Sequence, residues 1–156
     1  MEAAYSVFKN IWLADDDHDD QLVFENAVRE ILPAVNLTLF TDSDELLNEL
    51  KRNTPDLLFL DINMPCRDGK QCLKLIKENP AYQTLPVIML TGSEYYEDIQ
   101  ACYKAGATLY VIKCYSYAEL NTCLKHLFQL NWNNLESIAN NQYVNKRFVP
   151  FSVLND

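Results

Sequence analysis

Five short apolar segments, each followed by a helical pattern, constrain the fold of this chain more than any other feature. The apolar segments cover residues 11–14, 37–40, 57–60, 85–90 and 109–112. Between them, apolar residues recur at three- and four-residue steps, as in Leu22, Val23, Ala27 and Val28, which is typical of one face of an amphipathic helix. Strands that alternate with helices form parallel sheets with helices on both faces. We therefore expect an α/β fold: a doubly wound, five-stranded parallel sheet flanked by five helices.

The third apolar segment is the most informative, because it runs from Leu57 to Leu60 without a polar residue and leads directly into Asp61. A strand that is apolar throughout is typical of a sheet that is buried on both faces. Ligands bind at the carboxyl ends of such strands. An isolated acid at this position would be explained equally well as a turn cap. Asp61 therefore becomes a site candidate only if other strand ends supply partners.

Polar residues do follow the other strands. Asp15 and Asp16 follow the first strand, Thr91 ends the fourth and Lys113 follows the fifth. Three neighbouring carboxylates repel one another and stay ionised only beside a cation, and hard oxygen ligands suit Mg²⁺. A magnesium ion, an ammonium and a hydroxyl together can neutralise the charge that moves in phosphoryl transfer. The sequence therefore predicts a magnesium-dependent site at which Asp61 is the nucleophile that forms an acyl phosphate.

In their order and spacing, these residues resemble the receiver domains of two-component response regulators of the chemotaxis-regulator type. The resemblance covers about residues 11–130, and its further matching motifs are Met64-Pro65, Asp68-Gly69 and Thr91-Gly92. It implies a flavodoxin-like receiver domain over residues 1–130. Residues 131–156 would then form a C-terminal extension, either an extra helix packed on the body or an arm that reaches a second copy.

The resemblance implies a role for each acid. Asp61 would accept the phosphoryl group from a histidine kinase or a phosphotransfer protein. Mg²⁺ would be held by the carboxylates of Asp16 and Asp61 and by the backbone carbonyl of Asn63, with Asp15 acting through water. The protein would then be a stand-alone response regulator that assists its own phosphorylation and dephosphorylation but is not an enzyme for an outside substrate.

The resemblance also implies a switch. Thr91 and Lys113 would bind phosphoryl oxygens, and Tyr110 would turn inward when Thr91 moves toward the phosphate. This movement would alter the face made by the fourth helix, the fifth strand and the fifth helix, where a downstream protein target binds. Asn63 and Ser93 flank the site, and we expect them to tune the lifetime of the acyl phosphate by controlling access of water.

One position departs from the family pattern. The family usually has a proline after the lysine, joined through a cis bond, whereas Lys113 is followed by Cys114. A cis bond without proline costs about 3–4 kcal/mol, so we expect a trans bond and an altered loop. The departure leaves open a degenerate receiver that acts as a phosphate-independent interaction module.

Two other classes of protein share part of the acidic pattern. A haloacid dehalogenase-type phosphatase would use Asp15 and Asp17, but it needs an acidic pair after Lys113 and gives Asp61 no role. A calcium-binding EF-hand loop would begin at Asp15, but the required glycine and glutamate are absent, because Asp20 and Asn26 hold those positions. We disfavour both classes.

Composition limits the partners and the location. The formal charge is −9 and no cluster of Lys and Arg is present, which argues against a nucleic-acid surface. No apolar run is long enough to cross a membrane, and the N-terminus lacks a signal-peptide pattern, so we expect a cytoplasmic protein.

The five cysteines form no Cys-x-x-Cys pair, so neither a zinc site nor a disulfide framework is predicted. The sequence leaves homodimerisation through the last helices or the tail open.

Overall fold

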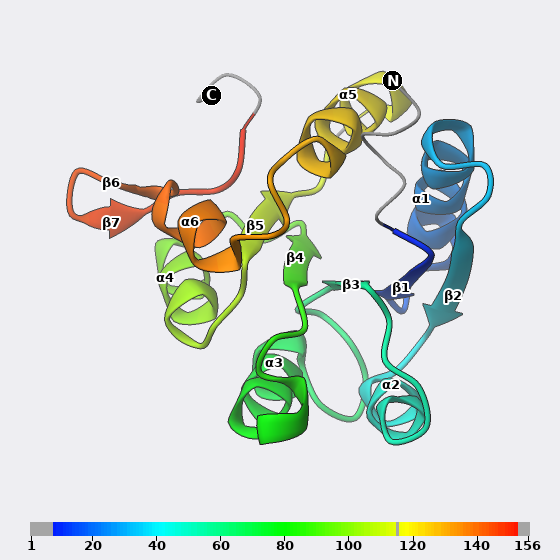
Figure 1. The fold of residues 1–156 in the computed structure, drawn as a ribbon, viewed down its shortest axis with the longest axis horizontal. Helices are drawn as coiled ribbons and strands as arrows, with labels where there is room; N and C mark the ends of the chain where they lie inside the picture. The colour runs from blue at the N-terminus through cyan, green and yellow to red at the C-terminus, as the bar shows by residue number, and fades with distance from the viewer. Residues whose placement is uncertain (1–7, 115, 153–156) are drawn as a thin grey trace.

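The computed structural model describes residues 8–114 and 116–152. Its centre is a five-stranded parallel sheet with the strand order β2-β1-β3-β4-β5 (Figure 1). The strands are β1 (Asn10–Ala14), β2 (Asn36–Phe40), β3 (Leu57–Leu60), β4 (Val87–Thr91) and β5 (Leu109–Ile112). The order places β3 at the centre and β5 at one edge. The doubly wound, flavodoxin-like receiver fold expected from the sequence is confirmed.

Five helices connect and follow the strands: α1 (His18–Ile31), α2 (Ser43–Leu50), α3 (Gly69–Glu78), α4 (Tyr96–Lys104) and α5 (Tyr117–Phe128). Helices α1 and α5 cover one face of the sheet, and α2, α3 and α4 cover the other (Figure 1). Four of these helices start at a side-chain cap that the sequence contains, supplied by Asp17, Asp42, Asp68 and Ser116. Such caps satisfy backbone N–H groups that the first turn leaves free.

The core consists of two apolar clusters, one on each face of the sheet. All four residues of β3 are buried, as expected for a central parallel strand. Helix α1 buries Gln21, Phe24, Ala27 and Val28. Leu22, however, is 56% exposed and Val23 is also exposed, so the helical pattern assigned too wide an apolar face to α1.

The C-terminal extension packs on the body of the molecule. It contains a sixth helix, α6 (Leu135–Asn140), and an antiparallel hairpin of β6 (Tyr143–Val144) and β7 (Arg147–Phe148). Ile138 of α6 is buried in the cluster that α1 and α5 share. The extension lies beside α4 and β5 (Figure 1). The domain boundary at residue 130 stays a prediction.

No helix in the described part of the chain combines the length and the apolar character that a bilayer crossing requires. All five cysteines carry free thiols.

Candidate functional site

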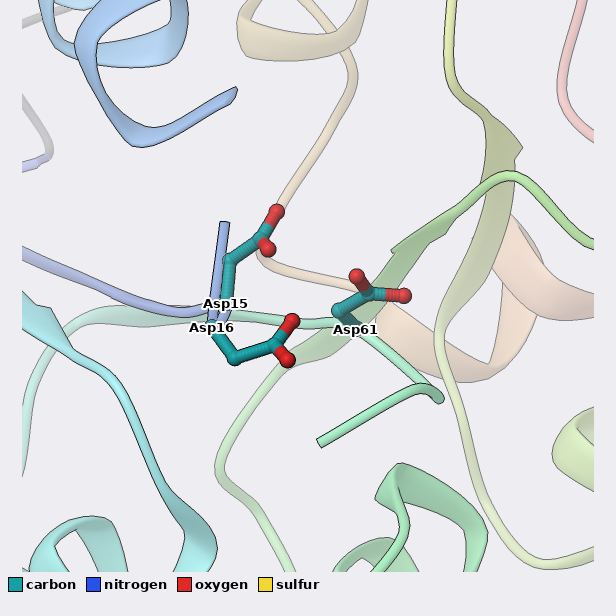
Figure 2. Close-up of side chains that lie close together, drawn as sticks. All are labelled: Asp15, Asp16 and Asp61. Atoms are coloured by element: carbon teal, nitrogen blue, oxygen red, sulfur yellow. The ribbon is translucent and has the colours of Figure 1, made fainter. Parts of the chain in front are cut away.

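The pairing of β1 with β3 brings the acidic residues together. Ala14 and Leu60 are paired at the ends of these strands, and the Asp61 N–H donates to the Ala14 carbonyl oxygen at 2.9 Å. Asp15, Asp16 and Asp61 therefore leave the sheet side by side (Figure 2). One carboxylate oxygen from each lies within 4.8 Å of the others. The predicted convergence of these strand ends is present.

The three carboxylates differ in their exposure to water. Asp15 is 1% exposed and Asp61 is 3% exposed, whereas Asp16 is open to solvent. Burial raises the pKa of Asp15 to about 6, against the opposing effects of the Asp17 backbone N–H and the Lys113 ammonium. Near neutral pH, the site therefore holds several anionic oxygens in a partly dry setting, where a compact cation fits.

Lys113 supplies the positive charge of the site. Its Nζ lies 2.9 Å from a carboxylate oxygen of Asp15, 2.9 Å from one of Asp61 and 2.7 Å from one of Asp20. Burial alone would lower the pKa of Lys113, but the three carboxylates raise it above its usual value. One ammonium does not balance these carboxylates and Asp16, so the site keeps a net negative charge.

The departure at Cys114 does not displace Lys113. The bond between Lys113 and Cys114 is trans, as expected, since no described bond is cis. The Lys113 N–H donates to the Thr91 carbonyl oxygen at 2.8 Å, which extends the pairing of β4 with β5 beyond Ile112. This pairing directs the Lys113 side chain to Asp61.

Asp20 belongs to the site, although the sequence did not suggest it. An acid in the first turn of a helix is explained by the helix dipole, which stabilises negative charge there. The sequence signal for Asp20 is its position relative to the start of α1. Asp17 caps α1 at its first turn, which places Asp20 on the side of α1 that reaches Lys113.

Thr91, Ser93 and Tyr110 form a connected group at the end of β4. Thr91 is fully buried, and its hydroxyl oxygen accepts from the Ser93 N–H at 3.4 Å. The Tyr110 hydroxyl donates to the Ser93 carbonyl oxygen at 2.8 Å, and burial raises the pKa of Tyr110 to about 12. The Ser93 hydroxyl donates to Asp98 of α4 at 2.5 Å. Tyr110 is fully buried and therefore occupies the inward position.

The loop after Asp61 is closed by Gly69. The Gly69 N–H donates to the Ile62 carbonyl oxygen at 2.7 Å. A Cβ at residue 69 would lie 2.0 Å from the Asp61 carbonyl oxygen, which no side chain allows. The Asn63 N–H points back to a carboxylate oxygen of Asp61 at 3.4 Å. The role of the Asn63 carbonyl as a metal ligand stays a prediction.

Comparison with known proteins points to one family. The model of the response regulator receiver domain matches residues 11–125. The DNA-binding transcriptional regulator NtrC of Proteus hauseri is 32% identical over 134 residues, which are 83% of this chain and 28% of that protein. The chain therefore spans less than a third of the length of this relative.

Solved structures agree with the family match. The phosphorylated cyanobacterial phytochrome response regulator RcpA superposes with a TM-score of 0.72 at 26% identity, over 77% of this chain and 91% of that chain. The Mn²⁺-bound form of the response regulator Rcp1 superposes with a TM-score of 0.65 at 25% identity, over 92% of this chain and 99% of that chain. The match to Rcp1 is long enough to extend into the C-terminal extension.

Proposed function

Because the chain belongs to the response regulator receiver domain family, whose members accept a phosphoryl group on an aspartate, we propose that Asp61 is the acceptor in this chain. The observation that carries this proposal is the position of Asp61 in the sheet. It ends the central strand β3, between Asp15 and Asp16 on the β1 side and Thr91 on the β4 side. Its carboxylate also lies 2.9 Å from the Lys113 Nζ. A phosphoryl group on Asp61 would thus have cation ligands on one side and hydrogen-bond donors on the other.

Receiver domains bind Mg²⁺ at an acidic pocket, and the aspartate cluster of this chain fits that ion. Its donors are hard carboxylate oxygens, and one ammonium leaves them with a net negative charge. We assign Asp16, Asp61 and the Asn63 carbonyl as ligands, with Asp15 acting through water. When bound, Mg²⁺ supplies positive charge that offsets the charge of the transferred phosphoryl group.

The other residues act on the phosphoryl oxygens. Lys113 is already held at Asp61 by its ion pairs, and the Thr91 hydroxyl lies at the end of the neighbouring strand. A phosphoryl group offers both residues charge-assisted hydrogen bonds that exist in one state only. Such a difference is required for a ligand to shift a conformational equilibrium. Tyr110 would respond to this conformational change through the hydrogen bond that its hydroxyl donates to the Ser93 carbonyl oxygen.

We propose that the phosphoryl donor is a sensor histidine kinase or a phosphotransfer protein, and that a downstream protein target reads the face made by α4, β5 and α5. The chain assists its own phosphorylation and dephosphorylation without an outside substrate. Asn63 and Ser93 tune the lifetime of the acyl phosphate. A cytoplasmic location and a homodimer stay predictions, and the degenerate alternative has no support, because Lys113 reaches Asp61 despite Cys114.

The test is mass spectrometry of the purified chain after treatment with acetyl phosphate and Mg²⁺. We expect a phosphate-sized mass gain on the peptide that contains Asp61, and no gain in the Asp61→Asn variant, which should keep its fold. Asp44→Asn is a matched control, because Asp44 is exposed in the first turn of α2. Continued labelling of Asp61→Asn would place the nucleophile elsewhere.

A further inference from the structure

The free edge of β5 is covered by the chain's own C-terminal segment. Residues 142–151, which we call the edge segment, contain the β6–β7 hairpin and the residues that follow it. Phe148 packs against the apolar cluster on the α2–α3–α4 face, and Phe151 belongs to the cluster on the α1–α5 face. The edge segment therefore closes the side of the sheet where β5 has no neighbouring strand (Figure 1). Proteins commonly protect such edges, because unpaired N–H and C=O groups bind other chains.

A single side chain of α4 holds the edge segment by its backbone. Gln100 Nε2 donates to the Phe148 carbonyl oxygen at 2.6 Å, and the Phe148 N–H donates to Gln100 Oε1 at 2.9 Å. Gln100 is 8% exposed. One amide thus satisfies both backbone groups of Phe148, in the way that a neighbouring strand would.

Aromatic packing adds to this contact. The Phe148 ring stacks on Tyr103 of α4, with ring centroids 4.7 Å apart and an interplanar angle of 12°. Tyr143 meets the same Phe148 ring edge-on, with centroids 4.9 Å apart. Phe148 is therefore the anchor of the edge segment.

The edge segment also binds the backbone of Tyr110. The Phe151 N–H donates to the Tyr110 carbonyl oxygen at 2.8 Å. On the same residue, the Tyr110 N–H donates to the Tyr103 hydroxyl at 3.0 Å. Both backbone groups of Tyr110 are thus bonded outside the sheet, one to α4 and one to the edge segment.

We propose that the edge segment is an intramolecular ligand of the α4–β5 face, and that its docking and the occupancy of the Asp61 site favour each other. This inference rests on the proposed function, in which Tyr110 is the switch. Phe148 stacks on Tyr103, and the Tyr103 hydroxyl accepts from the Tyr110 N–H, so the docked segment packs against the residue of α4 that contacts Tyr110. In this proposal, docking narrows the space at the free edge of β5 and so favours the inward position of the Tyr110 ring.

The contact chain from the acid site to the edge segment is continuous. The Thr91 hydroxyl oxygen accepts from the Ser93 N–H, the Ser93 carbonyl accepts from the Tyr110 hydroxyl, and the Tyr110 carbonyl accepts from the Phe151 N–H. In this proposal the Tyr110 ring has two positions: the acid site acts on its hydroxyl, and the edge segment acts on it through the Tyr110 backbone and the packing of Phe148. A coupling between two binding events is reciprocal, so each event strengthens the other by the same factor.

In this proposal the edge segment already occupies the α4–β5 face in the absence of any partner protein. An outside partner that binds β5 or α4 at Gln100 must displace the edge segment, and an extended peptide with an aromatic residue in the place of Phe148 has the matching chemistry. In this protein, phosphorylation would tighten the edge segment rather than release it.

Hydrogen exchange of the Phe151 backbone amide tests docking directly. In the full chain without ligand, we expect this amide to be protected, and Phe148→Ala and Gln100→Ala each to reduce its protection by about fivefold or more. Val144→Ala is the matched control, since Val144 lies in the same hairpin and is exposed. An unprotected Phe151 amide in the unchanged protein would overturn the proposal.

Beryllofluoride with Mg²⁺, a phosphate mimic, tests the coupling. We expect it to raise protection of the Phe151 amide by about fivefold or more. Calorimetric titration should show that Phe148→Ala and Gln100→Ala weaken beryllofluoride binding, by at most that factor, while Val144→Ala binds normally. Binding with unchanged or lowered protection would overturn the coupling and leave the proposed function intact. Failure of the unchanged protein to bind beryllofluoride would instead count against the proposed function.

Discussion

Strand β5 serves two regions that are built in different ways. At its carboxyl end, Lys113 lies among carboxylates, and the site is held by charge. Along its free side, Tyr110 meets the edge segment through neutral hydrogen bonds and aromatic packing. Charge interactions depend on pH, salt and bound ions, whereas apolar packing depends on buried area. The acid site should therefore respond directly to pH, salt and bound ions, and the C-terminal extension should respond to them only through its coupling to an occupied Asp61 site.

The largest expected effect is that of Lys113→Met. Loss of the ammonium should slow labelling of Asp61 by acetyl phosphate about 100-fold, because a charge-assisted bond to the phosphoryl group disappears. Without Mg²⁺ the variant should also unfold at a lower urea concentration, because buried Asp15 and Asp61 lose their counterion.

Lys74→Met is its matched control. Lys74 makes an exposed surface pair with Glu78 at 3.9 Å, so Lys74→Met should change neither labelling nor stability. Normal labelling of Lys113→Met would mean that the ammonium does not touch the transferred group.

Ile138→Ala tests the apolar region. The cavity left under α6 should lower the free energy of unfolding by about 2 kcal/mol, roughly a thirtyfold change in the folding equilibrium. Labelling of Asp61 should stay within about twofold, because Ile138 lies away from the acids. The loss of stability, measured by urea unfolding, should be the same at low and high salt. A loss that grew with salt would break the contrast between the two regions.

Mg²⁺ binding should depend on pH through Asp15. Its pKa is raised to about 6 by burial, so the fold favours the protonated carboxyl, and in the absence of metal Asp15 makes the protein less stable as pH rises from about 4 to 6. Mg²⁺ needs the ionised form, so its affinity should fall by up to about tenfold per pH unit below pH 6.

Calorimetry at pH 5, 6 and 7 measures this effect, and Asp15→Asn should flatten it. Protection of the Phe151 amide, measured without Mg²⁺ and corrected for intrinsic exchange, should stay level over the same range. A parallel loss of protection would show that the two regions share a titrating group.

Asp20→Asn should have the smallest effect. Asp20 is half-exposed, and a partly hydrated ion pair contributes about 1 kcal/mol or less, so labelling should change by less than about fivefold. The exposed neighbour Asp19 gives the control variant Asp19→Asn. A tenfold loss of labelling rate would make Asp20 a required positioning residue for Lys113.

The fold and most of the site could be predicted because both depend on short-range signals. Apolar segments that end on polar residues mark the strands, and Asp17, Asp42, Asp68 and Ser116 mark the helix starts. The parallel topology then places the strand ends together without knowledge of any side-chain contact.

The parts that could not be predicted depend on long-range contacts. Gln100 and Phe148 are 48 positions apart, and neither residue type indicates a partner. Gln21 is buried in α1 because its amide donates to the carbonyl oxygens of Asp15 and Phe40, while the apolar Leu22 beside it faces water. The apolar periodicity alone predicts that Leu22 is buried and Gln21 exposed. This prediction is wrong, because periodicity does not include hydrogen bonds that form only in the folded chain.

The contact between Gly69 and the Asp61 carbonyl has a consequence for engineering. The first residue of α3 lies directly against the Asp61 carbonyl, so the start of α3 and the end of β3 cannot move apart or together without changing this contact. Randomising codon 69 and selecting for labelled protein should recover glycine alone. Designs that shift or rotate α3 to change the reactivity of Asp61 should therefore fail. Changes in that reactivity should come instead from substitutions in the loops that follow β4 and β5.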